Sequence, residues 1–158
     1  MVNLETISML FLISCPVILF TIAIITTVLL VVRRWRSKHT EQVLRTFANK
    51  RVLAVEPNAN FFGQESSGYI QVRGNGILLV TEEELYFEMW MPRRVLHIPK
   101  AALLSVGTSS SHLGKTRGSL LLKVVFQNPQ GEVDSAAWLV QDLHTCVQSL
   151  DELMSGHH

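Results

Sequence analysis

Four cations in two short stretches of the sequence are the residues best suited to bind a ligand. Arg93 and Arg94 are adjacent at a predicted turn, and Lys115 and Arg117 lie in the polar stretch 108–118. Clustered cations at turns suit anionic groups such as a phospholipid headgroup. The alternative interpretation is that these side chains only keep two surface turns in water.

The same polar stretch contains part of a nucleotide-binding motif. Gly114, Lys115 and Thr116 match the end of a phosphate-binding P-loop, which needs a glycine five positions before Gly114 and a helix after the motif. Ser109 stands at the first position, and a strand is predicted at the second. The sequence therefore predicts a polar loop here and no nucleotide site.

The serines, histidines and carboxylates do not form an arrangement that catalysis or metal binding needs. Residues 109–111 are serines beside His112, but no third group is placed to orient the histidine. Residues 82–84 are glutamates that we interpret as a solvated turn. Metal-ligand spacing is also lacking among His39, His97, His112 and His144. We expect no catalytic residue, metal or cofactor.

The most prominent element is an uncharged apolar stretch over residues 7–32. As a helix it would be roughly 39 Å long, enough to cross a hydrocarbon core of about 30 Å. A basic collar follows it, formed by Arg33, Arg34, Arg36 and Lys38, with Trp35 at the interfacial aromatic position. Because basic residues beside a span stay in the cytoplasm, the sequence predicts a single-pass protein of the cell membrane with the N-terminus outside.

Other interpretations of this stretch fit less well. A cleaved signal peptide would carry its basic residues before a shorter apolar core. Leu12-Ile13-Ser14-Cys15 is similar to a bacterial lipoprotein box, but the apolar run lies mostly after the cysteine. A buried core helix would need partner layers that the rest of the chain is too small to supply. Pro16 is expected to kink the helix.

Charge and cysteine content limit the partners of the remaining chain. Beyond the collar there are ten Lys and Arg against twelve Asp and Glu, a formal charge of −2. This balance argues against nucleic acid as a ligand. The two cysteines, Cys15 in the span and Cys146 in a predicted helix, do not predict a disulfide.

The chain after the span is predicted to be mainly β with a C-terminal helix. About seven short apolar stretches, separated by turn signals such as Gly74-Asn75-Gly76, predict antiparallel strands. Apolar residues recur at helical spacing over 139–154 and predict an amphipathic capping helix. Such a sheet, folded on itself and covered by a helix, forms a barrel or sandwich.

Some boundaries in the first part of this domain are also predicted. Residues 57–60 are expected to end the first strand, residues 61–68 to be irregular, and residues 69–72 to form the next strand. The apolar pairs Phe61-Phe62 and Trp90-Met91 are either edges of the core or exposed contact points. The predicted organisation is an N-terminal tail (1–6), transmembrane helix (7–32), basic juxtamembrane connector (33–49), folded domain (50–154) and C-terminal tail (155–158).

The stretch 74–106 resembles the core of GRAM and bacterial PH-like domains. The matching features are Gly76, Thr81, the Leu85-Tyr86-Phe87 strand, Ile98-Pro99 and the apolar stretch 103–106. Residues 136–150 are similar to the last strand and capping helix of that family, so the resemblance covers about residues 50–154. It implies a PH-like fold, whose members bind lipids, peptides or no detectable ligand. The basic cluster of phosphoinositide-binding PH domains is not found in the first hairpin.

The expected function is therefore a non-catalytic binding module held at the cytoplasmic membrane surface. The expected partners are the membrane, a protein and an anionic phospholipid, with the protein ranked first because the anchor already supplies membrane attachment. Homo-oligomerisation is left open. The alternative is an accessory subunit whose span packs into a larger membrane complex through small residues such as Thr21, Ala23, Thr26 and Thr27.

Overall fold

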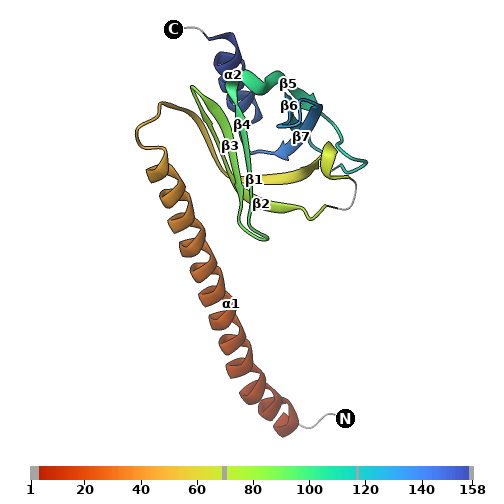
Figure 1. The fold of residues 1–158 in the computed structure, drawn as a ribbon. Helices are drawn as coiled ribbons and strands as arrows, with labels where there is room; N and C mark the ends of the chain where they lie inside the picture. Colours follow the sequence, from red (N-terminus) through yellow and green to blue (C-terminus); the bar gives the residue numbers. More distant parts are fainter. Residues whose placement is uncertain (1–3, 69–70, 117, 157–158) are drawn as a thin grey trace. The chain divides into compact units, whose positions relative to one another are not determined.

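The computed structural model describes residues 4–68, 71–116 and 118–156, with the side chains of the first helix described from Val17 onward. The chain divides into two compact units, one ending at Arg45 and the other beginning at Thr46 (Figure 1). Each unit is described separately below.

The first unit is one continuous helix, α1 (Leu4–Thr46). The helix continues without a break from the apolar stretch through the basic collar and most of the predicted connector. Residues 33–46 contain no glycine or proline, and Glu41 and Arg45 form an ion pair of 2.7 Å one turn apart, which favours helix over this stretch. The helical connector therefore follows from its composition.

The described part of α1 contains a candidate membrane span by length and composition. Val17–Thr46 includes a window of mean hydropathy 2.2, and none of that window is buried within the protein. The hydroxyls of three threonines in its apolar part are satisfied inside the helix. Thr21, Thr26 and Thr27 each donate to the carbonyl four residues earlier at 2.8 Å. Such a helix can face lipid without leaving these groups unpaired.

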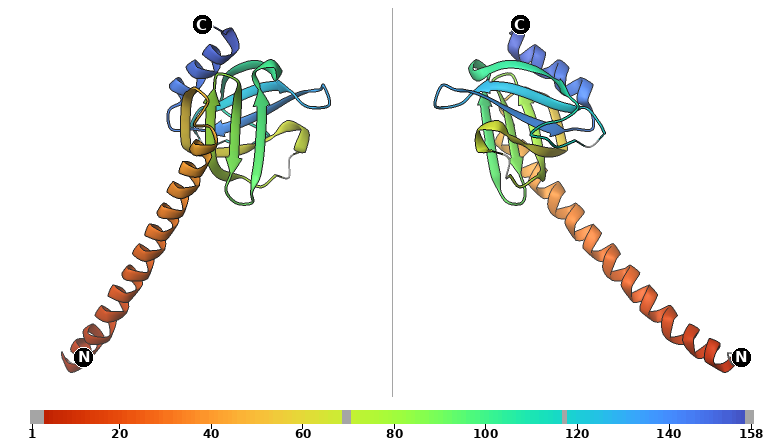
Figure 2. Two further views of the ribbon diagram at one scale, coloured as in Figure 1. Left: turned by 60° about the vertical axis from the view of Figure 1, so that its left-hand side comes forward. Right: turned by 90° about the vertical axis from the view of Figure 1, so that its right-hand side faces the viewer.

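The second unit is an antiparallel sheet with one helix packed on it (Figure 2). Within the described residues, seven strands pair in the order β4-β3-β2-β1-β7-β6-β5. The elements are β1 (Val52–Gln64), β2 (Gly74–Thr81), β3 (Glu84–Met89), β4 (Arg94–Pro99), β5 (Leu103–Ser109), β6 (Leu121–Gln127), β7 (Val133–Leu139) and α2 (Leu143–Ser155). The predicted fold class, mainly β with a C-terminal helix, is confirmed, and the sheet is not closed.

The core lies between the two halves of the curved sheet and α2. The rings of Phe61, Phe87 and Trp138 are fully buried and meet at centroid distances of 5.3 to 5.7 Å. Leu150 and Leu153 of α2 are buried in the same cluster. The Asp142 carboxylate caps this helix by accepting from the Thr145 amide at 2.9 Å. Packing of α2 thus covers one end of the open sheet.

The boundaries predicted for the first strands are wrong in three places. β1 continues through residues 57–60 and across 61–64, and its register with β2 shifts between Glu56 and Ala59. A bulge at this point accommodates Pro57, which has no amide to donate. Gln71 and Val72 are not in a strand, and the other two residues of the predicted strand 69–72 lie outside the described residues.

The predicted turn at residues 74–76 is the beginning of β2. Gly76 pairs with Met89, and a Cβ on Gly76 would lie 2.2 Å from the carbonyl oxygen of Glu88. The glycine is therefore explained by the close approach of β3 rather than by turn geometry. Phe61 and Phe62 are both fully buried and so belong to the core, whereas Met91 is 75% exposed.

Candidate functional site

Two of the predicted ligand-binding cations, Arg94 and Lys115, both contact Gln71. The Arg94 guanidinium donates to the side-chain oxygens of Ser67 (2.9 Å), Gln64 (3.0 Å) and Gln71 (3.4 Å). The Lys115 ammonium lies 3.5 Å from the Gln71 carbonyl oxygen. Arg94, Lys115 and Gln71 are called the cationic junction below. Arg117 lies outside the described residues.

Arg93 has a different environment from its neighbour. Its Nε donates to the Glu88 carboxylate at 2.9 Å, and the same carboxylate accepts the Tyr86 hydroxyl at 2.8 Å. Burial and this hydrogen bond to a carboxylate raise the pKa of Tyr86 well above its ordinary value. Arg93 is therefore neutralised by an acidic partner, whereas the described partners of Arg94 are neutral.

A tight turn positions Lys115. The backbones of His112 and Lys115 exchange two hydrogen bonds of 2.9 Å, and the residues between them, Leu113 and Gly114, have φ of 50° and 69°. Two consecutive positive φ values are those of a type I′ turn, which explains Gly114. The glycine and lysine that resemble a P-loop thus belong to a hairpin tip.

The turn is fixed to the sheet by a buried histidine. His112 is 3% exposed, and its Nε2 donates to the Gly63 carbonyl oxygen at 3.1 Å. Burial lowers the pKa of His112, and the charge of Lys123 lowers it further. Residues 112–115 are therefore held on β1 through a neutral imidazole, and the interpretation of this part of the polar stretch as a merely solvated loop is wrong.

A buried carboxylate supports the other side of the cationic junction. Asp134 is 1% exposed and accepts from the Gln64 amide and the Ser66 hydroxyl at 2.6 Å, and from the Ser66 amide at 3.0 Å. Burial alone would raise the pKa of Asp134, but these hydrogen bonds outweigh it, and the pKa lies below its ordinary value. Asp134 thus orients the Gln64 side chain that contacts Arg94.

We expect Asp134→Asn to reduce the free energy of unfolding by about 1–3 kcal/mol at pH 7, because charged hydrogen bonds are replaced by weaker ones. The folded-state pKa is lowered, so the contribution is present above the ordinary value of 3.8 and is lost as pH falls through the folded pKa. Pulse proteolysis in urea between pH 7 and 3 measures the difference, which should shrink at the acidic end. Asp151→Asn, at an exposed position of α2, is the control. A difference independent of pH would contradict the assignment.

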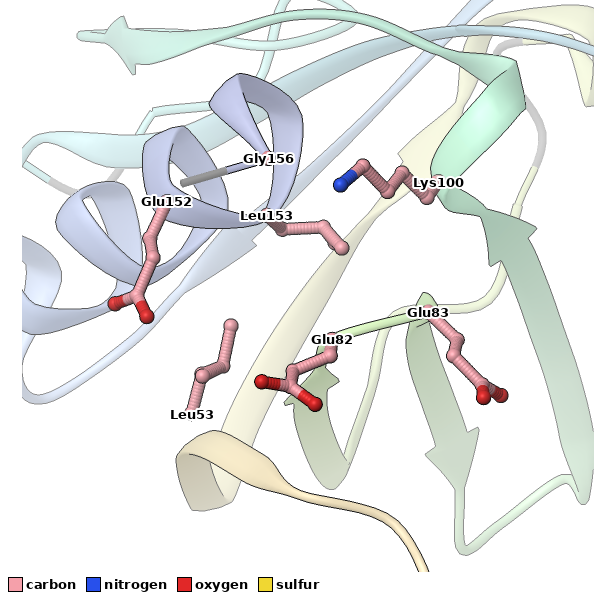
Figure 3. Close-up of a pocket in the computed structure, with 7 residues that line it drawn as sticks. All are labelled: Leu53, Glu82, Glu83, Lys100, Glu152, Leu153 and Gly156. Atoms are coloured by element: carbon pink, nitrogen blue, oxygen red, sulfur yellow. The ribbon is translucent and has the colours of Figure 1, made fainter. Parts of the chain in front are cut away.

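Glu82 and Glu83, in the turn between β2 and β3, line a pocket of about 240 Å³ (Figure 3). Glu82 and Glu83 face it with Lys100, Glu152 and the end of α2, and the Lys100 side chain extends toward that end. Arg51 pairs with Glu82 at 2.9 Å, and Lys50 pairs with Glu83 at 2.7 Å. The carboxylates of Glu82 and Glu83 are thus paired with basic neighbours, and the pocket is a largely polar gap between the sheet and α2.

Metal-ligating side chains are scattered in the described residues. Among them, no three or more His, Cys, Asp or Glu are grouped in a way that could hold a metal ion. Cys146 is buried on α2, and burial raises the pKa of its thiol to about 11. This thiol is therefore protonated at neutral pH and unsuited to act as a nucleophile.

The two edges of the open sheet differ in how they are protected. β4 carries Arg94 and Pro99, and its His97 pairs with the Glu84 carboxylate. β5 has the sequence LLSVGTS, with no charge and no proline, and among the described strands it pairs only with β6. Leu104 on this edge is 52% exposed, and a Cβ on Gly107 would meet no atom within 4 Å. We call β5 the open edge.

Sequence reasoning did not identify the open edge or the role of His112. An uncharged strand can be recognised in the sequence of residues 103–109, but its position at the edge of the sheet depends on the order in which the strands pair. His112 follows three serines in a polar stretch, and nothing in that pattern indicates burial against β1.

Comparisons with known proteins concern the fold alone. No family model and no curated protein matches this chain. A chain in the structure of the 8S snRNP assembly intermediate is similar at 14% identity and a TM-score of 0.53, over 68% of this chain and 84% of that chain. The C-terminal domain of an unknown protein from Leishmania infantum is similar at 15% identity and a TM-score of 0.53, over 73% of this chain and 97% of that domain. An antiparallel sheet with a C-terminal helix is thus an arrangement that this chain shares with distant solved structures.

Proposed function

We propose that this chain is a non-catalytic, single-pass membrane protein that presents a PH/GRAM-like binding module to a protein partner at the cytoplasmic membrane surface. The observation that carries the proposal is the open edge. The partner contributes an extended segment that pairs with β5 and adds a strand to the sheet.

The physical basis is the unpaired backbone of an edge strand. An exposed edge offers a row of amide and carbonyl groups that pair readily with another chain, so proteins usually protect edges with charges, prolines or bulges. β4 has a charge and a proline, whereas β5 has only one register shift, between Leu103 and Ser105. Addition of a strand to such an edge is a common form of peptide recognition, with backbone hydrogen bonds as its main source of affinity.

The membrane part of the proposal is supported by α1. Its apolar side chains from Val17 to Val32 are exposed in the protein, as a lipid-facing helix requires. The basic collar follows directly. Trp35 lies between its cations, and the Trp35 ring packs on the ring of His39, one turn later, at a centroid distance of 4.5 Å. The excess of Lys and Arg after the span supports an external N-terminus and a cytoplasmic module.

Lipid binding and a subunit role are competing functions. Arg93 has an acidic partner in Glu88, and the anchor makes lipid binding by the module unnecessary for membrane attachment. Thr21, Thr26 and Thr27 have their hydroxyls satisfied within the helix, so they do not require a neighbouring helix. Both functions are outcomes of the experiment below.

The experiment introduces a photo-crosslinking residue into the full-length protein in its membrane at Ser105 on β5, at His97 on β4 or at Ile25 on α1. We expect a defined protein adduct from Ser105 and not from His97. An adduct found only from Ile25 would support the subunit alternative and contradict the module. Lipid adducts from Ser105 without protein adducts would support lipid binding.

Replacement of Leu104 by Lys is expected to reduce the affinity for the crosslinked partner at least tenfold, because a lysine on an edge strand disfavours further pairing. Val133→Lys is the matched control, since Val133 is an exposed apolar residue (71%) on the interior strand β7. The affinity of each purified variant in lipid nanodiscs is measured by fluorescence anisotropy. Equal loss in both variants would exclude a specific role of the open edge.

A further inference from the structure

We propose that the segment paired with β5 is acidic at one end, and that the cationic junction binds its carboxylates. This inference rests on the proposed function and adds the chemistry of the partner. It follows from the positions of Arg94 and Lys115 relative to the open edge. It also follows from the ion pairs that neutralise four other cations of the module.

The cationic junction is connected to the end of β5 through the turn that follows this strand. β5 ends at Ser109, and the next residue, Ser110, accepts a hydrogen bond of 2.9 Å from the Thr116 hydroxyl. Lys115 is the neighbour of Thr116 and contacts Gln71, which also accepts from Arg94. A chain of contacts therefore connects the end of the open edge to both cations.

Arg94 and Lys115 have neutral partners. In the described part of the module, Lys50, Arg51, Arg93 and Lys123 each form an ion pair with a glutamate. Among the same residues Arg94, Lys115 and Lys100 form none, and each of the three is partly exposed. Lys100, however, lines a pocket together with three glutamates. Partly buried charges interact more strongly with an opposite charge than exposed ones do, so a carboxylate from a partner would be favoured at Arg94 and Lys115.

The guanidinium is also held in place before any ligand binds. Arg94 donates to side chains of Gln64, Ser67 and Gln71, and Gln64 is itself fixed by the buried carboxylate of Asp134. An arginine that is already oriented loses less side-chain freedom on binding a carboxylate. The cationic junction therefore has the charge and the rigidity of a carboxylate-binding site.

Acidic side chains predominate near the other end of β5, at Leu103. β5 is preceded by the 3₁₀ turn Lys100–Ala102, and the Lys100 amide donates to the Glu83 carbonyl at 2.7 Å. The pocket beside this turn is lined by Glu82, Glu83 and Glu152 together with Lys100 (Figure 3). Because Lys100 at the Leu103 end is accompanied by three glutamates, an acidic segment is attracted more strongly at the Ser109 end. This difference favours segments with acidic residues at one end.

The test uses the full-length protein in phosphatidylcholine nanodiscs and a set of labelled ten-residue peptides of alternating threonine and valine. One peptide carries two glutamates at its N-terminal end, one carries them at its C-terminal end, and one carries glutamines at both ends. We expect one acidic peptide to bind about tenfold more tightly than the neutral one, as charged hydrogen bonds of about 1.4 kcal/mol would give. The end preferred also reports whether the segment runs parallel or antiparallel to β5.

The variants assign the effect to the cationic junction. Arg94→Gln and Lys115→Gln should each bring the acidic peptide close to the affinity of the neutral one, while Arg93→Gln, whose side chain is 78% exposed and paired with Glu88, should not. Lys115→Gln is the more informative variant if Arg94→Gln disturbs β4. Equal preference for the acidic peptide in all variants would overturn the inference.

The outcomes separate this inference from the proposed function. Binding of all peptides with equal affinity, lost in Leu104→Lys, would retain the open edge as a strand acceptor and overturn the role of the cations. Binding of no peptide would contradict both. Preferential binding to phosphatidylserine nanodiscs that depends on Arg94 and Lys115, without peptide binding, would replace the protein partner by a lipid surface.

Discussion

Replacing Leu19 and Phe20 together by lysine is expected to release the protein from the membrane. These residues lie at the middle of the predicted span 7–32, and their side chains are 62% and 69% exposed in the protein. Each lysine at the centre of a transmembrane helix costs about 2.5–3.5 kcal/mol in insertion, so the pair costs roughly 5–7 kcal/mol. The measurement is the fraction of full-length protein that remains with membranes after carbonate extraction.

The matched control is Leu19→Ile with Phe20→Leu, which keeps the stretch apolar and should leave the protein fully in the membrane. Protease protection of the two termini in sealed vesicles whose cytoplasmic face points outward tests the orientation. The N-terminus is expected to be protected and the C-terminal domain to be accessible. Carbonate-resistant association of the lysine variant would mean that residues 7–32 do not anchor the chain.

Replacement of Trp138 by alanine is expected to lower the free energy of unfolding of the module by about 3–5 kcal/mol. Trp138 is fully buried on β7, and its ring lies 5.7 Å from both Phe61 and Phe87. The substitution removes the central ring of the core and leaves a cavity between the two halves of the sheet. Since small domains have only about 5–15 kcal/mol of stability, the variant should be partly unfolded at 37 °C.

Pulse proteolysis of the full-length protein in urea measures the change, because the helix α1 would dominate a spectroscopic signal. Trp138→Phe is the informative companion. It retains an aromatic ring and removes the indole NH, which is buried without a hydrogen-bond partner among the residues that the structure describes. The phenylalanine variant should therefore lose clearly less stability than alanine. Equal losses in the two variants would show that ring packing is not the source of the effect.

The elements of this fold were largely predictable from the sequence, because each is marked locally. The uncharged stretch 7–32 and the helical periodicity of α2 depend on neighbouring residues alone. Gly74-Asn75-Gly76 shows the limit of this approach. The same letters suit a turn, but here Gly76 is required by the backbone of β3, which is a contact between strands.

The candidate site was predictable only in part. Arg94 and Lys115 were identified as cations at turns, but their common contact with Gln71 depends on a loop held by His112. The difference between β4 and β5 becomes visible only when the pairing order shows which strands are edges. Such information comes from pairing between distant parts of the chain, which local patterns do not contain.

The strand β1 also has a consequence for how the protein is made. Its first part pairs with β2, while Asn60 and Phe61 also pair with Leu139 and Trp138 near the end of the chain. During translation the meander from β1 to β4 can assemble as it leaves the ribosome. The remaining half cannot be joined until β7 emerges, because this contact spans a long stretch of sequence. The two halves of the sheet are therefore joined only after β7 has left the ribosome.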